Sequence, residues 1–411
     1  MKEIKYLIPE LLSPAGDWPS LRSAIDAGAD AVYFGIKGYN MRRAAENFDS
    51  LELAKIMSLL HKSGKKGYLT LNTIVYDREI GRVRKIIQLA KKTGVDAVIA
   101  WDMGVLQIAK EYDIPVHLST QASVSNFPSL RFFSELGIKR IVLARECSLA
   151  DIKKMTAQIK KHRLVCQLEA FVHGAMCVSV SGRCFLSQHF FKKSANRGEC
   201  LQPCRREYLI KDAVRGDEYV LGQDYVLSAK DLCTIDFVDQ LIKAGVSSFK
   251  IEGRMRSPEY VQVVTSAYRQ AIDAFFKGKL TVTLKKSLRK KLETVFTRGF
   301  ETGFYLGSPQ DIGSPAGLHG KEKVYLGEVT NYYHRIGVAE VLLRSDRVRV
   351  GDEILIFGKT TAACFSRVSE LQIEHRDVKT ASKGALVGIK LASPVKPHDK
   401  VFLWRKRDFV V

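Results

Sequence analysis

Five cysteines lie close together between positions 177 and 233, where the chain is rich in glycine and basic residues. The first four are separated by six, fifteen and three residues, and the fifth follows after 28 more: Cys177, Cys184, Cys200, Cys204 and Cys233. Packing does not require such crowding, whereas the thiolate ligands of a metal centre must converge on one point. The spacing lacks the paired C-x2-C motifs of a zinc ribbon, and its irregularity favours an iron–sulfur cluster. A zinc site and a catalytic thiol, such as Cys177 near His173, stay open as alternatives.

Other side chains with catalytic chemistry stand where apolar runs end. His173 is the last residue of one run, and an imidazole there could move a proton or simply bind the backbone. Asp17 and Glu252 follow two other runs and could orient ligands. We therefore predict His173, Asp17 and Glu252 as catalytic groups. The chain contains neither the H-E-x-x-H motif of zinc peptidases nor the G-x-S-x-G motif of serine hydrolases.

A repeating pattern predicts the frame that brings these residues together. Polar stretches with helical character end in glycine, and a short apolar run follows each of them. Eight such units predict a closed (β/α)8 barrel, in which the chemistry lies at the carboxyl ends of the strands. The alternative is an open doubly wound sheet. The G-x-G-x-x-G motif typical of such sheets does not follow the first apolar run of this sequence. The expected strands are Glu10–Ser13, Ala31–Gly35, Gly67–Ile74, Ala97–Trp101, Val116–Ser119, Arg140–Ala144, Leu168–His173 and Ser248–Glu252.

The rest of the chain divides into three further parts. The cysteines at 174–228 form a long insertion after the seventh strand of a barrel that spans 1–276, and long loops in compact domains are usually functional. Residues 277–321 combine a very basic helical segment with a glycine-rich linker. Short alternating runs in 322–411 predict a small all-β barrel.

Composition and charge narrow the partners. Lysine and arginine total 65 against 44 acidic residues, which gives a net charge of +21. Such a charge favours a polyanionic partner such as RNA over the alternative, a basic surface without a specific partner. No apolar run is long enough to span a bilayer, and the first residues do not resemble a signal peptide. We therefore expect a cytoplasmic protein without membrane contact, whose clustered cysteines stay reduced.

Several long motifs resemble the collagenase-like peptidase family U32. They are ELLSPAGDWPSLRSAIDAGADAVYFG, FVHGAMCVSVSGRCFLS, SANRGECLQPCRREY, FKIEGRMRSPEYV and FTRGFETGFYLG. The C-terminal region is similar to domain two of elongation factor Tu. The resemblance implies an oxygen-independent hydroxylation. It would form 5-hydroxyuridine at the tRNA wobble position with prephenate as co-substrate, form 5-hydroxycytidine in 23S rRNA, or hydroxylate rings of the ubiquinone precursor. It also implies a [4Fe-4S] cluster with the ligands Cys177, Cys184, Cys200 and Cys233, and with Cys204 as the alternative ligand.

The charge of the chain favours RNA over an apolar ring as the substrate. Reaching carbon 5 of a base requires that the base leaves its stack. A dicarboxylate such as prephenate would need arginine forks. The candidates for these are Arg42, Arg43, Arg145, Arg183, Arg254 and Arg256.

We therefore expect a tRNA wobble-uridine hydroxylase. The alternatives are a 23S rRNA cytidine hydroxylase, a peptidase, and an RNA-binding protein whose cluster is structural. The resemblance also leaves room for a second family subunit or a homo-oligomer as partner.

Overall fold

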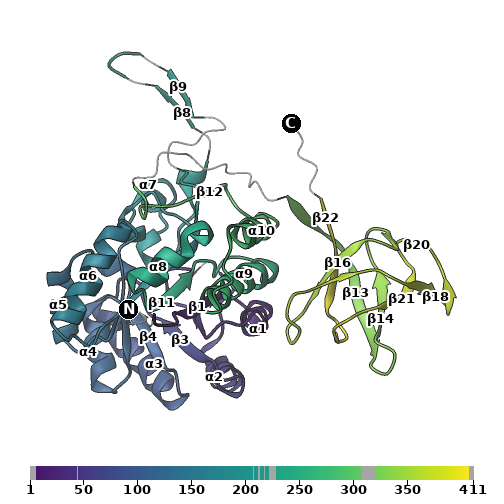
Figure 1. The fold of residues 1–411 in the computed structure, drawn as a ribbon, viewed down its shortest axis with the longest axis horizontal. Coiled ribbons are helices and arrows are strands. Elements are labelled where there is room, and N and C mark those ends of the chain that lie inside the picture. The colour runs from purple at the N-terminus through teal and green to yellow at the C-terminus, as the bar shows by residue number, and fades with distance from the viewer. Residues whose placement is uncertain are drawn as a thin grey trace.

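The computed structural model describes residues 6–43, 45–206, 208–211, 213–216, 218–221, 228–307 and 320–406. The end of the predicted insertion, most of the glycine-rich linker and the last five residues lie outside this part. Figure 1 shows two units, a helix-covered barrel and a smaller all-β unit beside it.

Eight parallel strands form a closed barrel, which confirms the predicted (β/α)8 architecture. Each strand pairs with the next, and the eighth closes the ring by pairing with both the first and the seventh. The third strand ends four residues earlier than expected, at Thr70. The strands are β1 (Glu10–Ala15), β2 (Ala31–Phe34), β3 (Lys66–Thr70), β4 (Ala97–Ala100), β5 (Val116–Leu118), β6 (Arg140–Val142), β7 (Gln167–Ala175) and β11 (Ser248–Ile251).

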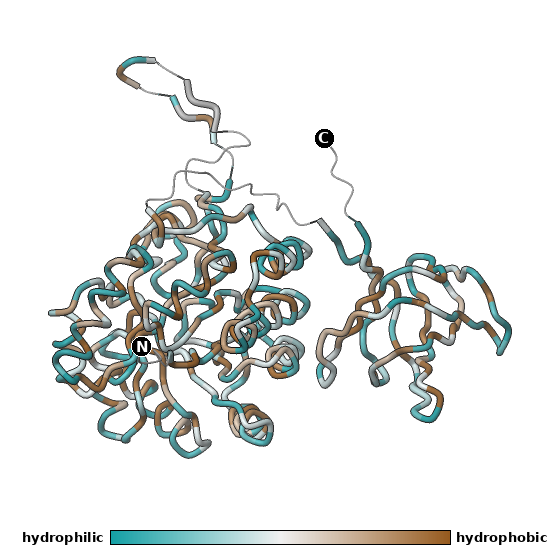
Figure 2. The backbone as a smooth tube through the Cα atoms, in the orientation of Figure 1, coloured by the Kyte–Doolittle hydropathy of each residue, from teal (hydrophilic) through white to brown (hydrophobic). Residues whose placement is uncertain are grey.

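Helices cover the outside of this barrel, and Figure 2 shows hydrophilic stretches along them. The glycines expected to end helices have the left-handed backbone that favours this residue, as at Gly28 (φ 86°) and Gly245 (φ 88°). The helices are α1 (Trp18–Asp26), α2 (Leu53–Lys62), α3 (Ile80–Lys92), α4 (Met103–Glu111), α5 (Phe127–Glu135), α6 (Leu149–Lys161), α8 (Val238–Ala244) and α9 (Pro258–Phe276).

A network of charged side chains lies inside the barrel. The pattern of apolar runs in the sequence did not predict this network. Tyr68 donates a hydrogen bond of 2.9 Å to the carboxylate of Glu10, which also pairs with Arg140. Arg140 lies 3.7 Å from Glu169, and Glu169 accepts from Lys250 at 2.8 Å. Because these buried charges are mutually paired, their cost of desolvation is offset inside the barrel.

The cysteine-rich insertion leaves β7 and returns to the barrel through β10. Strand β10 (Asp231–Cys233) runs antiparallel to the end of β7 and also pairs with β12 (Phe300–Glu301). Within the insertion lie α7 (Leu186–Phe191) and a hairpin of β8 (Tyr208–Lys211) and β9 (Glu218–Leu221). Figure 1 shows this material at one end of the barrel, above the helices.

The basic segment after α9 forms α10 (Val282–Leu292), which packs against α9. The following unit is a curved antiparallel sheet with its own apolar core, as expected for the small all-β part. Its main strands are β13 (Lys321–Tyr333), β14 (Val338–Leu343), β16 (Glu353–Phe357), β17 (Cys364–Arg367), β18 (Leu371–Ile373), β19 (Arg376–Asp377), β21 (Leu386–Lys390) and β22 (Lys400–Lys406), with β15 (Val348–Arg349) paired to β20 (Thr380–Ala381).

The two units contact each other through side chains of α1 and α9. The backbone nitrogen of Ala363 donates a hydrogen bond of 2.9 Å to Ser23, and Lys323 lies 2.9 Å from Glu259. Trp404 of the all-β unit belongs to the same apolar core as the barrel. None of the helices in the described ranges is long and apolar enough to cross a membrane.

Candidate active site

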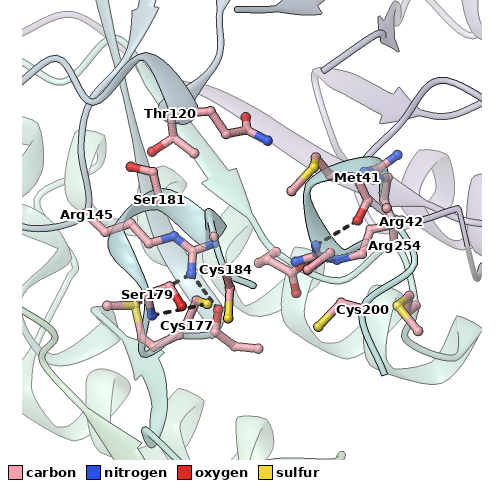
Figure 3. Close-up of a pocket in the computed structure, with 18 of the residues that line it drawn as sticks. Met41, Arg42, Thr120, Arg145, Cys177, Ser179, Ser181, Cys184, Cys200 and Arg254 are labelled. Atoms are coloured by element: carbon pink, nitrogen blue, oxygen red, sulfur yellow. Dashed lines mark hydrogen bonds and ion pairs between the residues drawn. The ribbon is translucent and has the colours of Figure 1, made fainter. Parts of the chain in front are cut away.

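A cavity of about 270 Å³ lies at the carboxyl ends of the barrel strands, between the strand ends and the insertion. Its barrel side includes Tyr33, Thr70, Phe171 and Lys250, and the insertion supplies most of the opposite wall. Figure 3 shows labelled cysteines and arginines on both sides of this hollow. We refer to it below as the cysteine pocket. Its position is the one where (β/α)8 barrels carry their chemistry.

Four of the five clustered cysteines line this pocket: Cys177, Cys184, Cys200 and Cys204. Each comes from a different turn of the insertion, so the irregular spacing reflects the short helical turns between them. Burial raises the pKa of the Cys204 thiol, Arg205 lowers it, and the charges of the other three thiols raise it further. Cys204 is therefore within electrostatic range of each of the other three pocket thiols.

Cys233 lies elsewhere. It sits on β10 beside His173 of β7, is 2% exposed, and has its sulfur 3.9 Å from the hydroxyl of Tyr268. Burial raises the pKa of this thiol to about 12, so it stays protonated. It does not line the pocket. The structure thus gathers the expected alternative, Cys204, with the first three cysteines and separates the expected fourth ligand, Cys233, from them.

The chemistry of the four thiols suits a cluster. The backbone nitrogens of Ser179 and Leu186 donate to the sulfurs of Cys177 and Cys184, both at 3.4 Å, and such bonds stabilise thiolates. Among the described residues, no three thiol, imidazole or carboxylate groups are close enough to hold a single ion as they stand. In a four-iron cluster each cysteine binds a different iron, so wider spacing is required. Four thiols that line one pocket are the donor set that a four-iron cluster uses.

Arg42 and Glu252 form an ion pair in the wall of the pocket. Two guanidinium nitrogens of Arg42 lie 2.9 and 3.2 Å from one carboxylate oxygen of Glu252. Burial alone would raise the pKa of Glu252, but Arg42, Arg145 and Arg256 outweigh burial and lower it. Glu252 is therefore ionised and holds Arg42 in place, instead of acting as a neutral acid.

Two other arginines face the pocket without a carboxylate within ion-pair distance in the described ranges. Arg254 is 5% exposed and donates to Asn40 at 2.9 Å and Thr70 at 2.8 Å. Burial lowers the pKa of Arg254 to about 10, which leaves it charged at neutral pH. Arg145 donates to the carbonyl of Ala175 at 2.7 Å. Both guanidinium groups are fixed by neutral acceptors, so their charge is available to an anionic ligand.

The remaining three predicted arginines differ in whether they line the pocket. Arg256 lines the pocket and lies 3.5 Å from Asp231. Arg43 is outside it and pairs with Glu199 at 3.4 Å. Arg183 is also outside and donates to Ser123 at 3.0 Å. Four of the six expected arginines therefore surround the pocket.

His173 and Asp17 do not reach the pocket. His173 is 2% exposed, its ring packs against Tyr268 of α9, and it is not among the residues that line the pocket. Burial and the charge of Arg256 lower the pKa of His173 to about 3, so the ring stays neutral. Asp17 caps α1 by accepting from the nitrogen of Ser20 at 2.8 Å. In the structure, His173 and Asp17, two of the three residues predicted as catalytic, have structural contacts outside the pocket.

Three cationic lining residues were missed by sequence reasoning: Arg205, Lys250 and Arg298. Each had a signal. Arg205 directly follows Cys204, while Lys250 interrupts an otherwise apolar strand, where an unpaired charge would be costly. The pocket therefore carries more positive charge than the predicted arginines alone supply.

Comparison with known proteins gives the family context. The model of peptidase family U32 matches residues 16–314. A protein named collagenase from Porphyromonas gingivalis is 41% identical, over 97% of this chain and 98% of its own length. The tRNA hydroxylation protein P1 of Bacillus subtilis is 34% identical, over 85% and 83% respectively. The 23S rRNA 5-hydroxycytidine C2501 synthase of Escherichia coli is 39% identical, over 73% of this chain and 44% of its own length.

Proposed function

Because this chain belongs to peptidase family U32, and because its relatives include proteins named for tRNA and rRNA hydroxylation, we propose that it hydroxylates RNA without oxygen. The substrate we propose is the wobble uridine of tRNA, which becomes 5-hydroxyuridine, with prephenate as co-substrate. RNA as partner agrees with the net charge of +21. We place the protein in the cytoplasm, where its tRNA substrate is found.

The observation that carries this proposal is the joint lining of one cavity by four cysteines and by arginines that lack a carboxylate partner among the described residues. A [4Fe-4S] cluster held by Cys177, Cys184, Cys200 and Cys204 would supply redox or Lewis-acid chemistry at the barrel mouth. The fixed guanidinium groups of Arg145 and Arg254 bind and orient the two carboxylates of prephenate. Glu252 keeps Arg42 oriented toward the same space.

A peptidase, suggested by the name of the family and by the relative named collagenase, is the second candidate. Nucleophilic hydrolysis needs a thiol or hydroxyl with a base within hydrogen-bond reach. His173 is the imidazole expected to serve Cys177, but it packs against Tyr268 of α9 and does not line the pocket. The described site thus offers the cysteines no such base from this histidine.

Nucleoside mass spectrometry tests the proposal. We expect tRNA from a strain that lacks this protein to lose 5-hydroxyuridine and its derivatives, and the wild-type gene to restore them. A gene carrying Cys184→Ser should not restore them, although the variant protein folds. Unchanged tRNA with loss of 5-hydroxycytidine from 23S rRNA would identify the rRNA instead. Unchanged nucleosides in both RNAs, with gelatin cleavage by the purified protein, would replace the proposal with the peptidase.

A further inference from the structure

Helix α7 presents aromatic rings to solvent beside the cysteine pocket. Phe185, just before the helix, is 76% exposed, and Phe190 near its end is 53% exposed. The Phe190 ring centroid lies 5.4 Å from that of His189 and 6.3 Å from that of Tyr208. Exposed rings forgo the hydrophobic stabilisation that burial of an aromatic side chain gives. Two such exposed rings, one at the start and one near the end of a short helix, indicate a binding surface.

Positive charge surrounds these rings. Lys192, Lys193 and Arg206 are exposed, and Arg206 stacks on Phe191 at 4.4 Å. Lys192 ends the helix with φ 57°, a left-handed backbone that usually selects glycine or asparagine. The acidic residue of this stretch, Glu199, pairs with Arg43. We call the exposed group Phe185, His189, Phe190, Lys192, Lys193 and Arg206 the α7 surface.

The α7 surface is the outer side of an element whose inner side forms the pocket. Leu186 and Ser187 of the same helix line the pocket, and the Ser187 hydroxyl lies 3.9 Å from the sulfur of Cys200. Phe185 directly follows Cys184 in the chain. Residues of the α7 surface thus adjoin residues that line the pocket.

We infer that the α7 surface stacks the unpaired bases that flank the base entering the pocket, so the protein binds looped or single-stranded RNA and not duplex. This inference rests on the proposed function, which requires an RNA at the pocket. Aromatic faces accept any unpaired base, and neighbouring lysines and arginines hold the phosphates. Bases inside a duplex are already stacked on one another and cannot use these rings. Lysine is depleted in the cores of protein interfaces, which disfavours a protein partner on the same surface.

Binding of a labelled RNA stem–loop to anaerobically purified protein tests this inference by fluorescence anisotropy. We expect Phe185→Ala and Phe190→Ala each to weaken stem–loop binding about tenfold, the effect of losing one stacked base. The same RNA annealed to its full complement should bind weakly, with no change in either variant. Phe132→Ala provides the matched control, because Phe132 is 57% exposed on α5, outside the insertion. Circular dichroism verifies that all three variants fold.

Three outcomes would overturn the inference. The first is unchanged stem–loop affinity in both variants, and the second is equal loss of stem–loop and duplex binding. The third is loss of self-association in sedimentation experiments with RNA affinity intact, which would assign the rings to a second copy of the chain. Failure of the proposed function is distinguishable, since unchanged cellular nucleosides with ring-dependent stem–loop binding would remove the activity and leave the RNA surface standing.

Discussion

Arg42, in the segment after β2, and Glu252, directly after β11, join two regions of the barrel mouth on either side of β1 through hydrogen bonds of 2.9 and 3.2 Å to a single oxygen. The pair orders the wall of the cysteine pocket and lowers the pKa of Glu252 despite its burial. It therefore couples the ionisation of one carboxylate to the stability of the site.

Glu252→Gln should lower the free energy of unfolding by about 1–3 kcal/mol at neutral pH, because Arg42 loses its charged partner. A carboxylate whose pKa is lowered on folding stabilises the protein above its unfolded pKa, and this contribution is lost as pH falls through the folded value. Urea unfolding of wild type and variant should therefore differ at neutral pH and converge in acid. Glu199→Gln is the control, because its pair with Arg43 is more exposed and should contribute less than about 1 kcal/mol.

Cys204 and Cys233, the two candidates for the fourth ligand, should respond differently to substitution. Cys204→Ser should abolish the brown colour and most of the iron of anaerobically purified protein, because Cys204 lies with the other three pocket thiols. Cys233→Ala should retain the iron and cost about 1 kcal/mol of stability through the small cavity it leaves. Iron content and the visible spectrum are the measurements. Loss of iron from Cys233→Ala alone would reverse the assignment of the fourth ligand.

Arg254→Gln should weaken binding of prephenate about tenfold or more, since it removes a fixed charge that has no carboxylate within ion-pair distance in the described structure. Titration calorimetry with prephenate measures the effect. Arg43→Gln is a matched change outside the pocket and should leave the affinity unaltered. Equal affinities for wild type and Arg254→Gln would show that this arginine does not bind the co-substrate.

Lys250→Met should destabilise the protein by about 3–5 kcal/mol, because Glu169 would keep its charge deep in the barrel without its partner 2.8 Å away. Adding Glu169→Gln should restore part of the loss, since the unpaired charge disappears. Thermal unfolding of the single and double variants gives the comparison. Equal stabilities of the single variant and wild type would mean that Arg140 alone suffices for Glu169.

The barrel was predictable because its signals are local: glycines that end helices, and apolar runs that form buried strands. The gathering of cysteines was also predictable, but the choice among five thiols was not. It depends on β10 pairing with β7, which removes Cys233 from the pocket, and such pairing between distant segments has no signature in spacing.

The sequence also did not reveal in which direction the side chains at the strand ends point. Successive residues of a strand point to opposite sides, so the end of a run does not tell whether His173 points inward. Its ring does not line the pocket, whereas Lys250, within a run taken as apolar, does. Residues that cap helices, such as Asp17, share their chemistry with catalytic carboxylates and are separated from them only by geometry.

The contacts of Ser23 with Ala363 and of Glu259 with Lys323 fix the all-β unit against α1 and α9. Because Trp404 shares the apolar core of the barrel, the two units should melt in one calorimetric transition. These contacts hold the all-β unit beside the barrel whose mouth carries the pocket. An RNA that contacts both the all-β unit and the pocket has to bridge the span between them. That span, and not only the sequence of the RNA, would then decide which molecules fit.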